Sequence, residues 1–173
     1  MSPRMSEHDE SSLFSYTQIL HLLKIEFARA RRYQYDLSCV LVEVDRLANL
    51  GDLHGSMVRD QVEASVAELL NRNSRSCDFV GHLGERFVLV LPHTDARGAA
   101  LLARRLHDRI AALEVRVDGR PIRISSSFGV ASHDSEDSIF FDAVLKRAEA
   151  ALAEAVSRGG DAVNVAGPSS PKG

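Results

Sequence analysis

The sequence contains no tryptophan, and aromatic residues make up only 6% of its 173 residues. Two cysteines, Cys39 and Cys77, are too few for a disulfide framework or a cysteine-based metal site. Lysine and arginine together number 21 against 24 acidic residues, so no basic excess exists to attract nucleic acid. No apolar run could span a membrane, and the polar, acidic N-terminus is not a signal peptide. We therefore expect a cytoplasmic protein that binds no nucleic acid.

The composition that remains is typical of one globular domain. Apolar residues make up 45% of the chain and charged residues 26%. The polar segments 1–11 and 167–173 are expected to be disordered, which leaves a single domain over residues 12–166.

Hydrophobic periodicity alternates between helix and strand along that domain. It predicts helices over residues 12–33, 57–71, 94–113 and 138–158, and a short helical turn within 46–55. It predicts strands over residues 37–44, 79–80, 87–91, 115–117, 122–131 and 162–165, with Gly81 and Gly84 supplying the chain reversal of one hairpin and Asp118-Gly119 closing another. Ser125 to Ser127 are interpreted as strand residues. The core order β-α-β-β-α-β predicts an α+β fold of the ferredoxin-like type, in which helices flank an antiparallel sheet.

Seven segments in this order resemble the GGDEF family, the fold of diguanylate cyclases and their catalytically dead relatives. The segments are Ala28–Arg32, Val42–Asp45, Asp52–Gly55 followed by Asp60, Arg75–Asp78, Gly84–Phe87 with Leu91-Pro92, Ser127–Ala131 and Arg147–Leu152. The family's N-terminal Asp-x-Leu-Thr-x-Leu turn is absent. The resemblance implies a central sheet like that of the nucleotidyl cyclases.

The resemblance also implies where catalysis would occur. Active members condense two GTP molecules into cyclic di-GMP by attack of a 3′-hydroxyl on an α-phosphate, assisted by divalent metal. The two metal-binding positions fall on Glu43 and Glu85, carboxylates that would still allow weak Mg²⁺ binding. The next hairpin position, acidic in the family, is Arg86, and the loop is one residue shorter. Gly51 stands where the family has a guanine-reading Asn, whereas that residue's partner, Asp60, is retained.

Two cations that grip triphosphate in the family are missing from the last helix. Val156 and Gly160 occupy their positions, and Asp161 adds a negative charge facing the polyanion. Each lost charged contact would cost about 1.5 to 3 kcal/mol. The sequence therefore predicts a degenerate cyclase site: no enzyme, no catalytic residue and no metal cofactor.

The family's second site, which binds the cyclic di-GMP product, is matched. It combines Arg-x-x-Asp before the hairpin with an Arg of the following helix, here Arg75, Asp78 and Arg105. An Arg fork can bind guanine O6 and N7 or phosphate oxygens, and Asp can accept from guanine N1–H. A second Arg adds charge and a plane for stacking. In the plainer interpretation, Arg75 and Asp78 form only a weak ion pair at a helix end.

The sequence thus predicts a cyclic di-GMP receptor in bacterial second-messenger signalling, with a protein partner or a second copy of itself. One alternative is a nucleotide-free interaction or dimerisation scaffold. It would be favoured if Arg75 and Asp78 pair and the helix carrying Arg105 blocks the pocket. Another alternative is residual GTP binding or weak cyclase activity at Glu43, Glu85 and Asp60.

Overall fold

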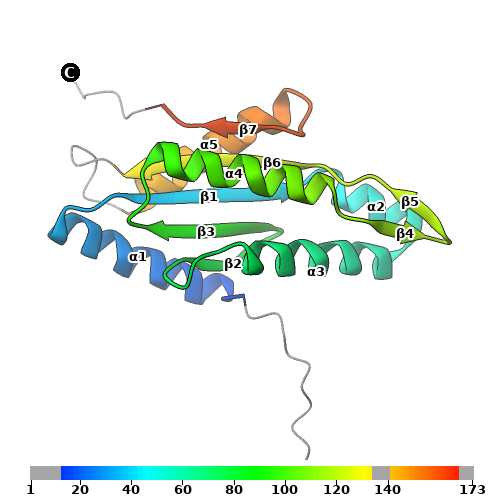
Figure 1. The fold of residues 1–173 in the computed structure, drawn as a ribbon, viewed down its shortest axis with the longest axis horizontal. Helices are drawn as coiled ribbons and strands as arrows, with labels where there is room; N and C mark the ends of the chain where they lie inside the picture. Colours follow the sequence, from blue (N-terminus) through cyan, green and yellow to red (C-terminus); the bar gives the residue numbers. More distant parts are fainter. Residues whose placement is uncertain (1–12, 134–140, 168–173) are drawn as a thin grey trace, which may run out of the picture.

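The fold is seen in a computed structural model, which describes residues 13–133 and 141–167 (Figure 1). The helices are α1 (Tyr16–Tyr33), α2 (Leu47–His54), α3 (Ser56–Arg72), α4 (Ala96–Ala111) and α5 (Asp142–Ser157). The strands are β1 (Leu37–Val44), β2 (Phe79–Leu83), β3 (Arg86–Pro92), β4 (Val115–Val117), β5 (Arg120–Ile122), β6 (Ser126–His133) and β7 (Val163–Val165).

The main sheet has the strand order β2-β3-β1-β6-β7. β1 pairs antiparallel with β3 on one side and with β6 on the other, and β7 runs parallel to β6. β1 is central because its run from Leu37 to Val42 is fully buried, as a strand covered on both faces must be. The arrangement confirms the predicted α+β fold with a ferredoxin-like core.

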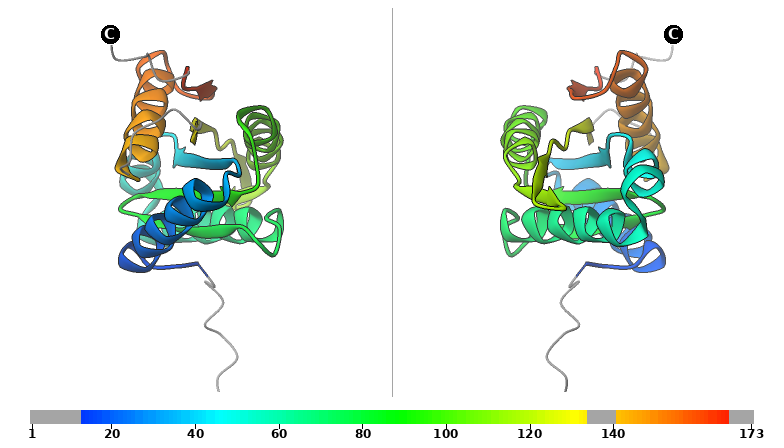
Figure 2. Two further views of the ribbon diagram at one scale, coloured as in Figure 1. Left: turned by 90° about the vertical axis from the view of Figure 1, so that its left-hand side faces the viewer. Right: turned by 90° about the vertical axis from the view of Figure 1, so that its right-hand side faces the viewer.

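Alternate residues of β1 pack into two different hydrophobic clusters, one on each face of the sheet. Val40, Val42 and Val44 pack in one cluster with apolar residues of α3 and α4. Leu37, Cys39 and Leu41 pack in the other, with residues of α1 and α5. Figure 2 shows these helix pairs on opposite sides of the sheet. The period-2 alternation of a strand thus explains why helices cover both faces.

The burial of Cys39 has a chemical consequence. Its thiol is fully enclosed in the α1–α5 core, and this desolvation raises its pKa to about 12. Cys39 is therefore a small core residue.

Helix α5 lies directly on β6 at Gly129. A Cβ added there would stand 2.2 Å from the carbonyl oxygen of Ala148 and 2.5 Å from the amide nitrogen of Leu152. Because backbone atoms cannot move aside as a side-chain end can, the contact requires glycine.

The structure corrects one predicted strand and one predicted turn residue. Gly81 does not supply a chain reversal, because it lies within β2 and pairs with Val88, so the turn is left to Gly84. The strand predicted over residues 122–131 is two elements: Ile122 ends the β4–β5 hairpin, and β6 begins only at Ser126. The intervening Ile124 lies outside both strands and is buried in the α3–α4 core. The last helix is described from Asp142, and residues 138–140 of its predicted start lie outside the described residues.

Most of the segments predicted to be disordered lie outside the described ranges. This holds for residues 1–11 and for 168–173, whereas Gly167 is described. Within residues 13–133 and 141–167, no helix combines the length and the apolarity that a membrane span requires.

Candidate functional site

Three residues predicted to bind a ligand line one cavity. Arg75 and Asp78 lie in the loop from α3 to β2, and Arg105 lies on α4. All three border a cavity of about 410 Å³ between that loop and α4. This volume is in the range of small-molecule sites. Residues about thirty positions apart in the sequence are thus brought to the same cavity.

The loop is fixed by reciprocal bonds between Arg75 and Asp78. The backbone N–H of Arg75 donates to Asp78 Oδ2 at 2.9 Å, and that of Asp78 donates to the Arg75 carbonyl at 3.0 Å. The Asp78 side chain is only 1% exposed, so it is held in place and shielded from water. Among the residues that the structure describes, its other oxygen, Oδ1, has one weak contact, with the Cys77 thiol at 3.8 Å.

The guanidinium of Arg75 is divided between two partners. Its Nε lies 3.6 Å from Asp78 Oδ2, a distance at which charges attract without a hydrogen bond. Its Nη2 donates to the hydroxyl of Thr94, in the turn between β3 and α4. The side chain is nevertheless 58% exposed, so the fork remains accessible from the cavity.

Arg105 stands on the opposite wall. It is an exposed residue of α4, and within the described part of the chain its guanidinium has no ion pair or hydrogen bond. The cavity thus presents one restrained guanidinium, one free guanidinium and one shielded carboxylate.

An aromatic pair lies at the edge of this cavity. His93 lines it, and its ring stacks on that of Tyr35 with the centroids 3.9 Å apart. The Tyr35 hydroxyl donates to Glu26 at 3.1 Å. Partial burial and this carboxylate together raise the pKa of Tyr35, so its hydroxyl stays protonated and neutral.

A nucleotide-free scaffold would be favoured if Arg75 and Asp78 paired and α4 blocked the pocket, and the structure meets this condition only in part. Arg75 and Asp78 do contact each other, but through one long ion pair rather than a closed, bidentate one. Helix α4 does not block the pocket, because Arg105 and Leu102 line an open cavity.

A second, smaller cavity contains the two carboxylates predicted to be metal-binding positions. Glu43 at the end of β1 and Glu85 in the β2–β3 turn line about 230 Å³ together with Arg46 and Arg86. Arg86 Nε lies 3.2 Å from Glu43, and Arg59 Nη2 lies 3.2 Å from Glu85. Each carboxylate is therefore paired with an arginine.

The other predicted guanine-site positions do not line this cavity, although Gly51 packs against Arg59, the partner of Glu85. Gly51 on α2 and Asp60 on α3 are not among its lining residues. In the described ranges there is also no cluster of three or more His, Cys, Asp or Glu residues arranged to hold a metal ion.

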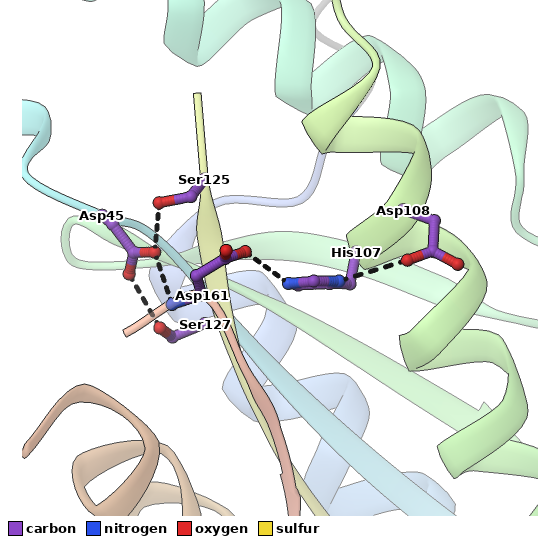
Figure 3. A network of polar contacts seen from close by, with 6 residues as sticks. All are labelled: Asp45, His107, Asp108, Ser125, Ser127 and Asp161. Carbon is purple, nitrogen blue, oxygen red and sulfur yellow. Dashed lines mark hydrogen bonds and ion pairs between the residues drawn. The ribbon is translucent and has the colours of Figure 1, made fainter. Parts of the chain in front are cut away.

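Sequence reasoning missed a polar network at the end of β1 (Figure 3). The Asp45 carboxylate accepts from Ser125 Oγ at 2.6 Å, from Ser127 Oγ at 2.7 Å and from the Asp161 backbone N–H at 2.8 Å. The Asp161 side chain lies 2.8 Å from His107 Nε2 on α4. The Asp161 carboxylate therefore contacts an imidazole and is not simply presented to a polyanion, as the sequence had suggested.

Comparison with known proteins identifies the class of protein that has this fold: the GGDEF domains of diguanylate cyclases. A family model described as "Diguanylate cyclase, GGDEF domain" matches residues 8–162. The chain is 32% identical over 145 residues to Diguanylate cyclase DgcP of Pseudomonas aeruginosa, which covers 83% of the chain and 21% of that protein. It is 32% identical over 156 residues to Diguanylate cyclase DgcM of Escherichia coli, covering 89% and 37%. The chain belongs to the GGDEF family.

Solved structures agree with this assignment. The active GGEEF domain of a diguanylate cyclase from Vibrio cholerae is 25% identical, with a TM-score of 0.84 over 91% of this chain and 99% of that one. The GGDEF domain of DgcB from Caulobacter crescentus, in complex with c-di-GMP, also has a TM-score of 0.84, over 95% and 98%. At 20% identity, the second match shows the shared fold alone.

The chain spans between about a fifth and two fifths of the length of these curated relatives.

The prediction that this chain is no enzyme is wrong by these comparisons. Its relatives at 32% identity are named diguanylate cyclases, and its fold matches a domain described as active. The prediction added up the missing contacts as independent losses. The structure shows that the second cavity still holds Glu43 and Glu85, and that Arg46 and Arg86 supply cations there. Two arginines therefore supply positive charge beside Glu43 and Glu85, although Val156 and Gly160 supply none.

Proposed function

We propose that this GGDEF domain binds cyclic di-GMP in the cavity formed by Arg75, Asp78 and Arg105, and that it acts in cyclic di-GMP signalling. The observation that supports the proposal is that these three residues, chosen from the sequence, line one cavity of about 410 Å³. Their chemistry suits an anionic ligand with guanine bases.

Each side chain has a separate role in this proposal. Arg105, which has no partner among the described residues, supplies charge to a phosphate and a plane for guanine. Arg75 presents its exposed fork to guanine O6 and N7 or to phosphate oxygens. Asp78 keeps Oδ2 for the loop; for Oδ1 to accept from guanine N1–H, the ligand must displace the groups that cover this side chain, which is only 1% exposed.

Titration calorimetry with cyclic di-GMP tests this proposal, with protein at about 50 μM so that micromolar binding gives measurable heat. Arg75→Ala and Arg105→Ala should each weaken binding about tenfold or more, since each removes a charge-assisted contact. Arg104→Ala is the matched control, because Arg104 neighbours Arg105 on α4 but does not line the cavity. Absence of heat, or equal affinities of Arg75→Ala and the unaltered protein, would contradict the proposal.

Diguanylate cyclase activity at the second cavity is the other candidate function. It is favoured by the names of the curated relatives and by the two carboxylates that share this cavity. Glu43 and Glu85 would hold Mg²⁺, which would neutralise phosphate charge. Arg46 and Arg86 would then bind phosphate oxygens, which requires Arg86 to exchange Glu43 for the nucleotide.

Incubation with GTP and Mg²⁺ followed by chromatography tests this second candidate. We expect cyclic di-GMP from the unaltered protein and none from Glu43→Gln, which keeps the side-chain size but removes the charge. Glu114→Gln, an exposed change outside the cavity, should leave the yield unchanged. Failure of the unaltered protein to form the product would refute this candidate without affecting the binding proposal.

A further inference from the structure

We propose that Thr94 is a positioning residue for cyclic di-GMP binding, because its hydroxyl holds the Arg75 guanidinium away from Asp78 and open toward the cavity. This inference rests on the proposed binding function. Thr94 itself lines the cavity and is 9% exposed, in the turn that joins β3 to α4.

The direction of the hydrogen bonds follows from chemistry. A threonine hydroxyl has one hydrogen and two lone pairs, whereas a guanidinium can only donate. Thr94 Oγ1 donates its hydrogen to the Pro92 carbonyl at 3.1 Å. Its lone pair is therefore left to accept from Arg75 Nη2. The hydroxyl is fixed as an acceptor at this side of the cavity.

The main chain of Thr94 is anchored to the middle of the sheet. The Ser38 hydroxyl of β1 lies 2.6 Å from the Thr94 carbonyl oxygen, to which it donates. Ser38 is fully buried, and its hydroxyl also lies 2.7 Å from that of Ser132 on β6. On the helix side, a Cβ added at Gly98 would lie 3.2 Å from the Thr94 methyl group, so the first turn of α4 packs close to it. Thr94 is thus a rigid point beside a flexible side chain.

Without this bond, Arg75 would have an obvious alternative partner. Arg75 and Asp78 are three residues apart in a tight loop, and arginine pairs with carboxylates through two parallel hydrogen bonds when geometry allows. The observed contact is instead a single approach of 3.6 Å. Loss of the Thr94 hydroxyl would let the fork close on Asp78. Both ligand-binding groups would then neutralise each other, and the ligand would have to separate them.

Substitution of Thr94 separates this role from simple packing. Thr94→Val keeps the shape and removes the hydroxyl, so we expect affinity for cyclic di-GMP to fall about tenfold, the loss of one hydrogen bond to a charged group. Thr94→Ser keeps the hydroxyl and should bind within about twofold of the unaltered protein. In an Arg75→Ala background, Thr94→Val should cause no further loss, because there is no guanidinium left to position.

Calorimetry on these four variants, with thermal melting to confirm that each is folded, decides between the outcomes. If Thr94→Val does not fold, Thr94→Ala takes its place with the same expectation. Normal affinity of Thr94→Val beside weakened Arg75→Ala would overturn this inference and leave the proposed function standing. An additional loss in the double variant would overturn it too. Absence of binding by the unaltered protein would overturn the proposed function and this inference together.

Discussion

Asp45 is the residue whose removal should destabilise the end of β1 most clearly. Its carboxylate accepts three hydrogen bonds, two from serines of the segment leading into and starting β6 and one from the turn before β7. It therefore ties together three chain segments that are distant in sequence. Asp45→Ala removes all three acceptor contacts at once.

The magnitude follows from the burial of the donors. Hydrogen bonds to charged groups contribute about 1.5 to 3 kcal/mol each, but bonds that share one carboxylate are not additive. Ser127 is fully buried and would lose this acceptor, whereas Asp161 is exposed and can turn to water. We therefore expect Asp45→Ala to lower the free energy of unfolding by about 2 to 4 kcal/mol, a large part of a typical total of about 5 to 15.

Asp45→Asn provides the sharper comparison. Its amide oxygen can replace Oδ2, which accepts from Ser125 and Asp161. Its NH₂ group can donate to Ser127 Oγ once that hydroxyl rotates. We expect Asp45→Asn to cost only about 1 kcal/mol, since the contacts persist without the charge.

Urea denaturation at neutral pH measures these differences, with Asp52→Ala, an exposed change on α2, as the control. An Asp45→Ala midpoint equal to that of the unaltered protein would refute this reasoning. So would an Asp45→Asn loss as large as that of Asp45→Ala, because charge rather than hydrogen bonding would then dominate.

Three further predictions concern the core and the surface. Gly129→Ala should lower the free energy of unfolding by about 1 to 3 kcal/mol or more, because its Cβ would meet the backbone of α5. Gly167→Ala is the control: its Cβ would meet nothing within 4 Å, so it should be neutral in the same urea assay. A thiol reagent at pH 8 should label exposed Cys77 in the folded protein and Cys39 only after unfolding, and labelling of both thiols in the folded protein would contradict this. The pKa of the Cys39 thiol is near 9 in the unfolded chain and about 12 in the folded one, so the free energy of unfolding should fall as the pH rises above about 9. Arg59→Ala should change stability by less than about 1 kcal/mol, since its partner Glu85 is 83% exposed, and a larger loss would show that this pair is not merely superficial.

Much of the fold was predictable because strong local signals agree with the tertiary structure. The apolar run of β1 predicted Leu37–Val44, the observed bounds, and Asp118-Gly119 predicted the hairpin of β4 and β5. The failure between residues 122 and 131 has a physical cause. Apolar Ile122 and Ile124 look like strand residues, but Ile124 is buried under α3 and α4 outside any pairing, a tertiary effect that a single sequence does not contain.

The candidate binding site was only partly predictable. The sequence indicated the charged side chains of the site but not Thr94, whose proposed role depends on its position in the fold. Arg75, Asp78 and Arg105 carry side chains whose chemistry and order can be read directly from a motif. Thr94 matters because of where its hydroxyl and its backbone lie, and both depend on contacts with β1 and with the loop after α3. The turn that carries it begins at His93, a non-glycine residue in the left-handed region with φ 53°, for which the sequence gives no signal.

The same distinction explains why the predicted loss of enzyme activity failed. Counting replaced residues treats each position as a fixed contributor, so Val156, Gly160 and Arg86 appeared as three separate losses. In the folded chain, however, Gly160 lies against the Asp45 carboxylate, and Arg86 enters the cavity that contains Glu43 and Glu85. An arginine that replaces an acidic residue removes a metal ligand, but it also brings a cation to the cavity where the proposed cyclase reaction would place phosphates. Whether a substitution weakens the binding of a polyanion therefore depends on the sum of the charges around the cavity. Only the fold brings those charges together.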